Sequence, residues 1–374
     1  MPNSCLGPNG AHANTEPLAG GISGKAQMTY SQARAGRGNV RSNRRVPAYE
    51  VDASWPRPLP DRWILGQCPG VAVDADDNIV VCNRQDITEE EAESGENAPM
   101  VIVFDPDGNV VRSWGEQATM PIKPERLNVD CEGNYWITGQ RDGMLQKYSP
   151  EGELLLQIGT RGKFDSSDGT IKGMALNKAK DGFFQPTAVA VDPGNLDVYV
   201  TDGYGNRRVA VFDKAGTFLR QWGRQATAEE AEAGAAGVFA NVVHDVVIAN
   251  NGLLYICDRW GNRIHVYEKD GTFVRNIWVG TGTPTLPDPR GTAWTMVFSN
   301  DPEQWLIYIV DGRNEQFHVI DHASGEIVYT YGRPGHQAGA FTHGHTIAID
   351  SRDNIYIGET HTGRRVQKFR PVRG

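Results

Sequence analysis

Short runs of alternating apolar and polar residues recur along the chain in pairs, and a polar turn separates the two runs of each pair. In the first pair, the apolar positions of residues 70–74 are followed by a turn and then by those of residues 78–82. Strict alternation over four to six residues predicts β-strands. The pair occurs six times, with first strands expected at residues 70–74, 126–130, 188–192, 245–249, 295–299 and 346–350.

Further apolar runs follow these pairs and complete a unit of four expected strands. The third and fourth runs are joined by tight turns such as Asp105–Gly108 and Asp213–Gly216, where glycine accepts a positive φ. The unit recurs at intervals of about 50 to 62 residues, a period typical of solenoids, propellers or arrays. Four antiparallel strands repeated radially predict an all-β, six-bladed β-propeller.

The two ends of the repeat predict how the ring closes. The last unit ends near Phe369 without a fourth strand, whereas Ala48–Asp52 precedes the first unit as a spare strand. We expect this N-terminal strand to complete the last blade, because closure removes exposed sheet edges. Residues 46–374 are therefore expected to form one propeller domain, and residues 1–45, which carry no periodicity, a loosely ordered arm.

One position of the repeat, just before each first strand, carries candidate chemistry. In an antiparallel blade the starts of first strands and the ends of second strands lie at the same rim of the propeller, here called the top rim. Its first-strand positions are Pro69, Glu125, Thr187, His244, Trp294 and His345. Two histidines and a carboxylate suffice for a catalytic zinc with an open coordination position, and they also suit iron(II). The plainer alternative is that Glu125, His244 and His345 are separate polar residues lining a wet channel.

The ends of the second strands supply five further candidates at the same rim: Arg84, Gln140, Tyr204, Arg259 and, one turn further on, His361. Two arginines beside a metal could clamp a substrate carboxylate through paired hydrogen bonds. Tyr204 could act as a general base if a cation lowered its pKa. Gln140 and His361 are expected to contact the substrate. The alternative is that the arginines bond backbone carbonyls and Tyr204 only packs.

Composition limits the partners and the compartment. The net charge of −9 and the pI of about 5.5 argue against nucleic acid, whose binding needs a basic surface. The sequence contains no run of 18 apolar residues, so no membrane span is expected. The N-terminus lacks the apolar stretch of a signal peptide, and the five cysteines include no CxxC pair, so a cytoplasmic protein with reduced thiols is expected.

Five segments in this framework carry a family resemblance: Gly66–Asp74, Gln185–Asp192, Thr201–Arg208, Cys257–Ile264 and Gly358–Thr362. With them, residues 60–370 resemble the NHL-repeat propellers and, within that group, the peptidyl-α-hydroxyglycine α-amidating lyases. The resemblance implies cleavage of a carbinolamide N–C bond to give an amide and glyoxylate.

The resemblance also implies roles for the rim residues. In that family three histidines at first-strand starts hold zinc; His244 and His345 match two of them, and Glu125 stands at the third. Tyr204 falls at the catalytic tyrosine, and Arg84 and Arg259 fall at the two arginines. Glutamate in place of histidine adds negative charge, which would weaken the Lewis acidity of the metal and could change its identity.

Two other family features depart from this sequence. A structural calcium is implied near the backbone carbonyls of Val71 and Leu127, but Thr346 stands where its carboxylate ligand belongs, which disfavours the calcium. The family's disulfide cysteines are also missing, because Gly205 follows the tyrosine.

The favoured hypothesis is a metal-dependent lyase, with zinc first and iron(II) second. Its substrate would be a small carbinolamide or α-hydroxy acid derivative carrying a carboxylate. A metal-dependent hydrolase such as a lactonase is the alternative on the same site, because a bound metal can also activate water. A non-catalytic NHL scaffold is the third hypothesis, and it predicts no tightly held metal.

Overall fold

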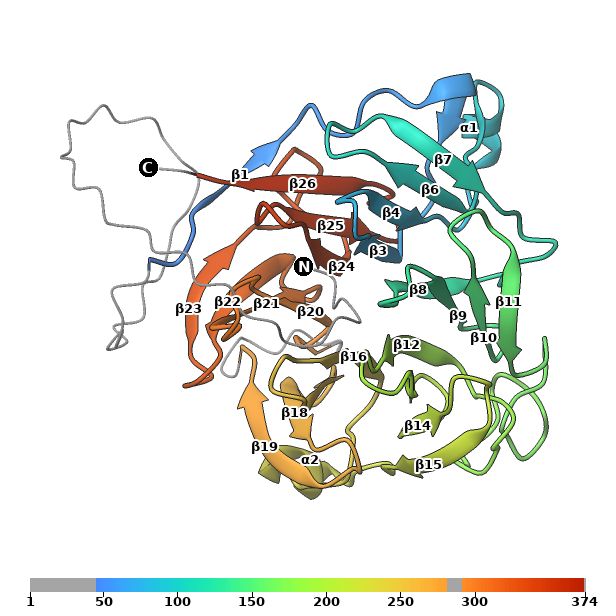
Figure 1. Cartoon of the computed structure of the whole chain (residues 1–374), viewed down its shortest axis with the longest axis vertical. Helices are drawn as coiled ribbons and strands as arrows, with labels where there is room; N and C mark the ends of the chain where they lie inside the picture. Colours follow the sequence, from blue (N-terminus) through green and yellow to red (C-terminus); the bar gives the residue numbers. More distant parts are fainter. Residues whose placement is uncertain (1–44, 281–290, 373–374) are drawn as a thin grey trace.

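The computed structural model describes residues 45–280 and 291–372, and within these ranges six four-stranded antiparallel sheets stand around one axis (Figure 1). The innermost strands pack against one another in a closed sequence from β3 through β8, β12, β16, β20 and β24 back to β3. The expected six-bladed all-β propeller is thereby confirmed. All of the predicted arm except Arg45 lies outside the described residues.

Each blade runs outward from the axis, and only the sixth draws on both ends of the chain. In order from the axis, the strands of blades one to three are β3 (Gly70–Val73), β4 (Ile79–Cys82), β6 (Val101–Phe104) and β7 (Val110–Trp114); β8 (Pro124–Val129), β9 (Tyr135–Gly139), β10 (Met144–Tyr148) and β11 (Leu154–Ile158); β12 (Pro186–Val191), β13 (Val198–Asp202), β14 (Arg208–Phe212) and β15 (Phe218–Trp222). Those of blades four to six are β16 (Val243–Ile248), β17 (Leu254–Asp258), β18 (Arg263–Tyr267) and β19 (Phe273–Trp278); β20 (Thr295–Phe298), β21 (Leu306–Asp311), β22 (Gln316–Asp321) and β23 (Ile327–Tyr331); β24 (Gly344–Ile349), β25 (Ile355–Glu359), β26 (Val366–Pro371) and β1 (Tyr49–Asp52).

The core lies between neighbouring blades, because both faces of each sheet are covered. Trp136 and Leu145 of blade two, for example, share one buried cluster with Val189 and Val200 of blade three. This packing explains why the second strands are buried along their whole length and carry few polar residues.

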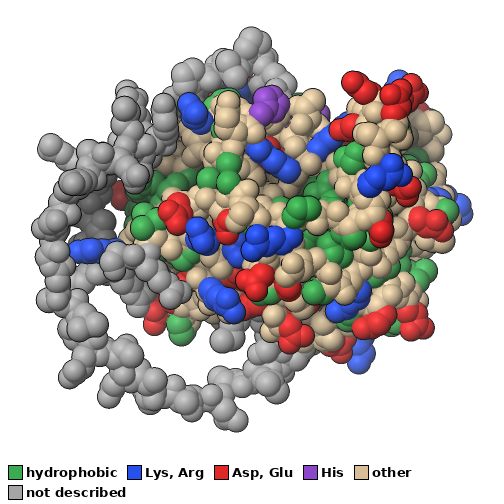
Figure 2. All heavy atoms as spheres, turned by 90° about the horizontal axis from the view of Figure 1, so that it is seen from above, with side chains coloured by type: hydrophobic (Ala, Val, Ile, Leu, Met, Phe, Trp, Pro, Cys, Tyr) green, Lys and Arg blue, Asp and Glu red, His purple; other side chains and the backbone are tan. Residues whose placement is uncertain are grey.

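Short elements decorate the blades. Two short glutamate-rich segments form the helices α1 (Glu89–Ala92) and α2 (Ala228–Ala233). Each helix begins with a capping box built on a threonine. A small parallel pair joins β2 (Trp63–Ile64) to β5 (Glu96–Asn97), and a 3-10 turn spans Pro60–Arg62. Figure 2 shows basic and acidic side chains interspersed over the face in view. No described helix is both long enough and apolar enough to cross a bilayer.

The cysteines correct one expectation. Cys68, Cys82 and Cys257 are buried free thiols, as expected. Cys131, however, is disulfide-bonded, and none of the other described cysteines is its partner. The expectation of five reduced thiols was therefore wrong at this position. A cysteine outside any CxxC pair gives no spacing signal that would have predicted this bond.

The spare strand closes the ring as expected. β1 pairs antiparallel with β26, and Tyr49 lies opposite Pro371. The Tyr49 ring meets Tyr308, Phe317 and Tyr331 edge-on at centroid distances of 6.0, 6.4 and 5.6 Å. Its hydroxyl donates a hydrogen bond to the Tyr308 hydroxyl at 3.1 Å.

Replacing Tyr49 with alanine should therefore weaken the closure. We expect a loss of about 2–3 kcal/mol in the free energy of unfolding, because a half-buried aromatic side chain is removed. Urea titration followed by tryptophan fluorescence measures this loss. Glu50→Ala is the control in the same strand, since it removes only an exposed ion pair with Arg370 and should cost less than about 1 kcal/mol. Equal effects of the two substitutions would contradict this role of Tyr49.

Candidate metal centre and active site

Local β-bulges aim the rim residues at the axis. The sequence predicted that these residues precede their strands, but Glu125, Thr187, His244 and His345 are each the second residue of theirs. At each of the four the pairing register with the next strand shifts. A bulge bends the strand and re-aims a side chain, so the same distortion serves three blades that supply the candidate ligands.

Glu125, His244 and His345 converge as predicted. One donor atom from each lies within 4.8 Å of the others, and all three residues are buried. The Oε1 atom of Glu125 lies 3.2 Å from Nε2 of His345 and 3.8 Å from Nε2 of His244. Ligand bonds of zinc near 2.1 Å in a tetrahedron place donor atoms roughly 3.4 Å apart, so the spacing fits such an ion.

Backbone carbonyls fix the face that each imidazole presents. Nδ1 of His244 lies 2.8 Å from the carbonyl oxygen of Trp294, and Nδ1 of His345 lies 3.0 Å from that of Pro69. A carbonyl oxygen can only accept, so both Nδ1 atoms carry hydrogen and both Nε2 atoms keep their lone pair when the rings are neutral.

The protonation states leave a gap that a cation would fill. Burial lowers the pKa of both His244 and His345, and the Arg259 charge lowers that of His244 further. Burial opposes ionisation of Glu125, yet the Arg84 guanidinium beside it holds the pKa of this carboxyl well below the usual range. Two neutral imidazole lone pairs thus face an ionised carboxylate, an arrangement that a divalent cation stabilises.

The guanidinium of Arg84 already makes three contacts with the protein, so only part of it is available to a substrate. Its Nη2 lies 2.6 Å from Oε2 of Glu125, its Nη1 donates to Gln67 and its Nε donates to the Pro124 carbonyl. The predicted role of Arg84 in binding a substrate carboxylate stays a prediction, and its partner in the structure is the candidate ligand Glu125. The paired guanidinium offsets the negative charge that glutamate brings to the metal set.

Tyr204 and Arg259 stand beside the histidines. The Tyr204 hydroxyl lies 3.4 Å from Nε2 of His244 and accepts a hydrogen bond from Nη1 of Arg259 at 3.0 Å. The Arg259 guanidinium stacks 3.8 Å from the centroid of a Trp294 ring. Burial and the Glu125 charge raise the pKa of Tyr204 above its ordinary value. Proton uptake by Tyr204 therefore depends on additional positive charge beside it.

A cavity of about 370 Å³ opens over these groups, and its lining includes the two predicted substrate contacts Gln140 and His361. Sequence reasoning assigned no role in substrate binding to four of its lining residues: Lys123, Trp294, His343 and Thr360. Lys123 adds a half-buried cation, the Trp294 ring forms a wall, and His343 stacks on His361 with ring centroids 3.8 Å apart. Lys123 stands two residues before Glu125, and Trp294 belongs to the predicted first-strand column, so only their proximity to the ligands could have pointed to them.

The guanidinium of Arg126 lies close to the position that the resemblance implies for a calcium ligand. Thr346 accepts a hydrogen bond from Nη1 of Arg126, whose Nη2 lies 3.5 Å from Oδ2 of the buried Asp245. The guanidinium therefore lies at the position where the resemblance implies a carboxylate ligand. Like charges repel, so calcium near Val71 and Leu127 is disfavoured.

Comparison with known proteins finds amidating lyases and amidating monooxygenases among the relatives of this chain. No protein-family profile matches the chain. It is 26% identical over 338 residues to the peptidylglycine alpha-amidating monooxygenase of Rattus norvegicus, covering 86% of this chain and 32% of that protein. It is also 26% identical over 350 residues to peptidyl-alpha-hydroxyglycine alpha-amidating lyase 2 of Drosophila melanogaster, covering 87% of this chain and 76% of that protein.

A third relative bears the repeat name alone. The NHL repeat-containing protein 3 of Homo sapiens is 25% identical, covering 71% of this chain and 65% of that protein. The expected resemblance to NHL-repeat propellers of the amidating-lyase type is thus confirmed. The chain spans about a third of the length of the amidating monooxygenases it matches.

Solved structures agree on the fold. A streptogramin B lyase structure superposes with a TM-score of 0.51 at 12% identity, covering 87% of this chain and 98% of that one. A virginiamycin B lyase of Staphylococcus aureus gives 0.51 at 13% identity, covering 86% and 89%. At such identities the likeness concerns the propeller fold alone.

The donor geometry predicts about one zinc or iron(II) per chain. Elemental mass spectrometry of the purified protein should detect it, and Glu125→Ala with His244→Ala should abolish it, because one imidazole cannot hold the ion. The matched control is Glu326→Ala with His336→Ala, which removes an exposed carboxylate and imidazole away from the cavity and should retain the metal. Equal metal content in both double variants would contradict the site.

Proposed function

We propose that this chain is a metal-dependent lyase of the amidating-lyase type. It would act in the top-rim cavity on a small carbinolamide, or a related α-hydroxy acid derivative, that carries a carboxylate. One observation carries the proposal: the Tyr204 hydroxyl lies 3.4 Å from Nε2 of His244, beside the three converging metal donors. A proton acceptor next to a Lewis-acid site suits a hydroxyl that is to become a carbonyl.

The metal donors would be Nε2 of His244, Nε2 of His345 and Oε1 of Glu125. A zinc or iron(II) ion held there supplies Lewis acidity and lowers the pKa of neighbouring hydroxyl groups. The Glu125–Arg84 ion pair keeps the added carboxylate from carrying a full uncompensated charge into the site. The relatives named lyases and monooxygenases support an enzyme of related activity.

Tyr204 and Arg259 would handle the proton. The phenolate of Tyr204 takes the substrate hydroxyl proton, the oxygen becomes a carbonyl, and the C–N bond breaks with its electron pair on nitrogen. The proton then passes to that nitrogen, so the products are an amide and an α-keto or aldehyde acid. Because burial raises the pKa of Tyr204, the Arg259 hydrogen bond and a cation beside His244 are both needed to form the phenolate.

Positive charge on the cavity wall would bind the substrate carboxylate. Arg259 and Lys123 both line the cavity, and Arg84 contributes the guanidinium hydrogens that its three protein contacts leave over. Gln140 and His361 offer further hydrogen-bonding groups on the same wall. An anionic small molecule is the partner that this set of groups favours.

Two other hypotheses remain open to test. The raised pKa of Tyr204 favours a hydrolase such as a lactonase, in which the metal set activates water and the phenol stays neutral. The similarity to NHL repeat-containing protein 3 favours a binding scaffold that holds no metal tightly.

Replacing Tyr204 with phenylalanine should lower turnover of an N-acyl-α-hydroxyglycine by about 10²- to 10⁴-fold, the usual contribution of a general base. Metal content and melting temperature should stay unchanged, because only the hydroxyl is lost. Product amide is measured by chromatography. Tyr329→Phe, a half-buried tyrosine of the outer strand β23, is the matched control and should keep full activity.

Near-normal turnover in Tyr204→Phe would refute the proton-transfer role. If the wild-type protein instead hydrolyses a simple lactone, and Tyr204→Phe retains that activity, the hydrolase hypothesis replaces the lyase. Absence of metal and of both activities would favour the scaffold.

A further inference from the structure

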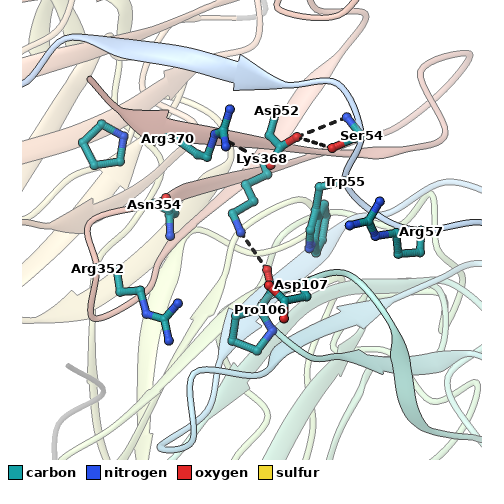
Figure 3. Close-up of a pocket in the computed structure, with 11 residues that line it drawn as sticks. Asp52, Ser54, Trp55, Arg57, Pro106, Asp107, Arg352, Asn354, Lys368 and Arg370 are labelled. Atoms are coloured by element: carbon teal, nitrogen blue, oxygen red, sulfur yellow. Dashed lines mark hydrogen bonds and ion pairs between the residues drawn. The ribbon is translucent and has the colours of Figure 1, made fainter. Parts of the chain in front are cut away.

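A second cavity, of about 440 Å³, lies where the two ends of the ring meet (Figure 3). Three segments line it: β1 with the connector that follows it, the turn between β6 and β7, and blade six with its turn between β24 and β25. In each blade these turns stand at the opposite end from the first-strand start. The cavity is therefore separate from the metal centre.

Positive charge predominates in the lining. It holds four cations, Arg57, Arg352, Lys368 and Arg370, against the two carboxylates of Asp52 and Asp107, which leaves a net charge of +2. The whole chain, by contrast, carries −9. Such a concentration of cations in an acidic protein calls for a counter-charge, because like charges in a shared cavity repel one another.

The described carboxylates nearby form ion pairs with only one of these four cations, Arg370. Arg370 lies 3.4 Å from Glu50 and 3.7 Å from Asp52, so its charge is largely matched. Asp52 also accepts hydrogen bonds from Ser54. Within the described ranges, no carboxylate forms an ion pair with Arg57 or Arg352. Two guanidinium groups thus remain available to a ligand.

Two buried donors make this a built site rather than a surface patch. Lys368 is only 7% exposed, and its Nζ donates to the Pro106 carbonyl at 2.7 Å. That is the one hydrogen bond from this ammonium group to the residues the structure describes, although the group can donate three. Figure 3 shows Lys368 reaching from β26 toward the Pro106–Asp107 turn, with Arg352 to the left of that turn.

The indole of Trp55 is the second donor. Trp55 is 6% exposed, and its Nε1 is buried without a hydrogen-bond partner among the described residues. Ring contacts with Phe104 and Tyr356, at 5.4 and 5.0 Å, hold the indole in place against the cavity. A buried N–H without an acceptor costs free energy, and an anion in the cavity is an acceptor that would recover it.

We propose that this cavity binds a doubly charged oxyanion, either inorganic phosphate or the phosphate group of a small phosphorylated molecule. A dianion matches the net charge of +2, and the planar fork of a guanidinium fits phosphate oxygens in pairs. The volume exceeds that of one phosphate and leaves room for an attached organic group. Because the ligand would bridge both ends of the ring, its binding also stabilises the closure.

The full-length protein is titrated with phosphate in a calorimeter at fixed ionic strength, with acetate and chloride as monovalent comparisons. We expect saturable binding of phosphate and of sulfate only. Arg352→Gln and Arg57→Gln, both exposed and safe for folding, should each weaken phosphate binding by about tenfold or more, as loss of a charge-assisted hydrogen bond does. Lys214→Gln, which removes an exposed cation from the turn between β14 and β15 of blade three, is the control and should bind phosphate like the wild type.

A change of opposite sign sharpens the test. Asp107→Asn removes the lining carboxylate that has no arginine partner in the described ranges, so it should tighten phosphate binding. Tighter binding of glycerol 3-phosphate than of phosphate would identify a phosphorylated molecule, and equal binding would identify the free ion.

Three outcomes would overturn the proposal. One is no saturable phosphate binding beyond the effect of chloride, and another is equal affinity in Arg352→Gln, Arg57→Gln and the wild type. The third is that Arg259→Gln loses phosphate binding while Arg352→Gln retains it, which would place the anion at the candidate metal centre instead.

Discussion

Every feature of the candidate site depends on one constraint, the closed ring in which each innermost strand starts at the same rim. The ring brings Glu125 within 3.2 Å of His345, although 220 residues separate them in the sequence. It also supplies their orientation across blade boundaries. Trp294, ahead of blade five, holds His244 of blade four, and Pro69, ahead of blade one, holds His345 of blade six. The junction between the last and the first blade is therefore part of the candidate metal site.

At two places along the propeller axis, the charged residues differ from those that the resemblance to the amidating lyases implies. A carboxylate, Glu125, enters the donor set, and Arg84 pairs with it at 2.6 Å. Further along, the guanidinium of Arg126 binds Thr346 and approaches Asp245. In both places a buried charge has an opposite partner, as buried charges require. The pairing leaves the two neutral imidazoles free to act as ligands.

Much of this arrangement could be predicted from the sequence, because the period of the repeat determines which residues share the rim. The closing strand at Tyr49–Asp52 and the convergence of Glu125, His244 and His345 followed from period and topology alone. The β-bulges, the pairing of Arg84 with Glu125 and the carbonyl of Trp294 did not. They depend on local register and on contacts between blades, for which residue spacing carries no signal. The disulfide of Cys131 also left no spacing signal in the sequence.

The central claim is that Glu125, His244 and His345 together hold one divalent transition metal. Anomalous X-ray diffraction from crystals of the purified protein, recorded on both sides of the zinc and iron absorption edges, tests it most directly. The account predicts a single peak at one of these edges, about 2.0–2.2 Å from both Nε2 atoms and from a Glu125 oxygen. A peak elsewhere in the molecule, or none after incubation with zinc and iron(II), would contradict it.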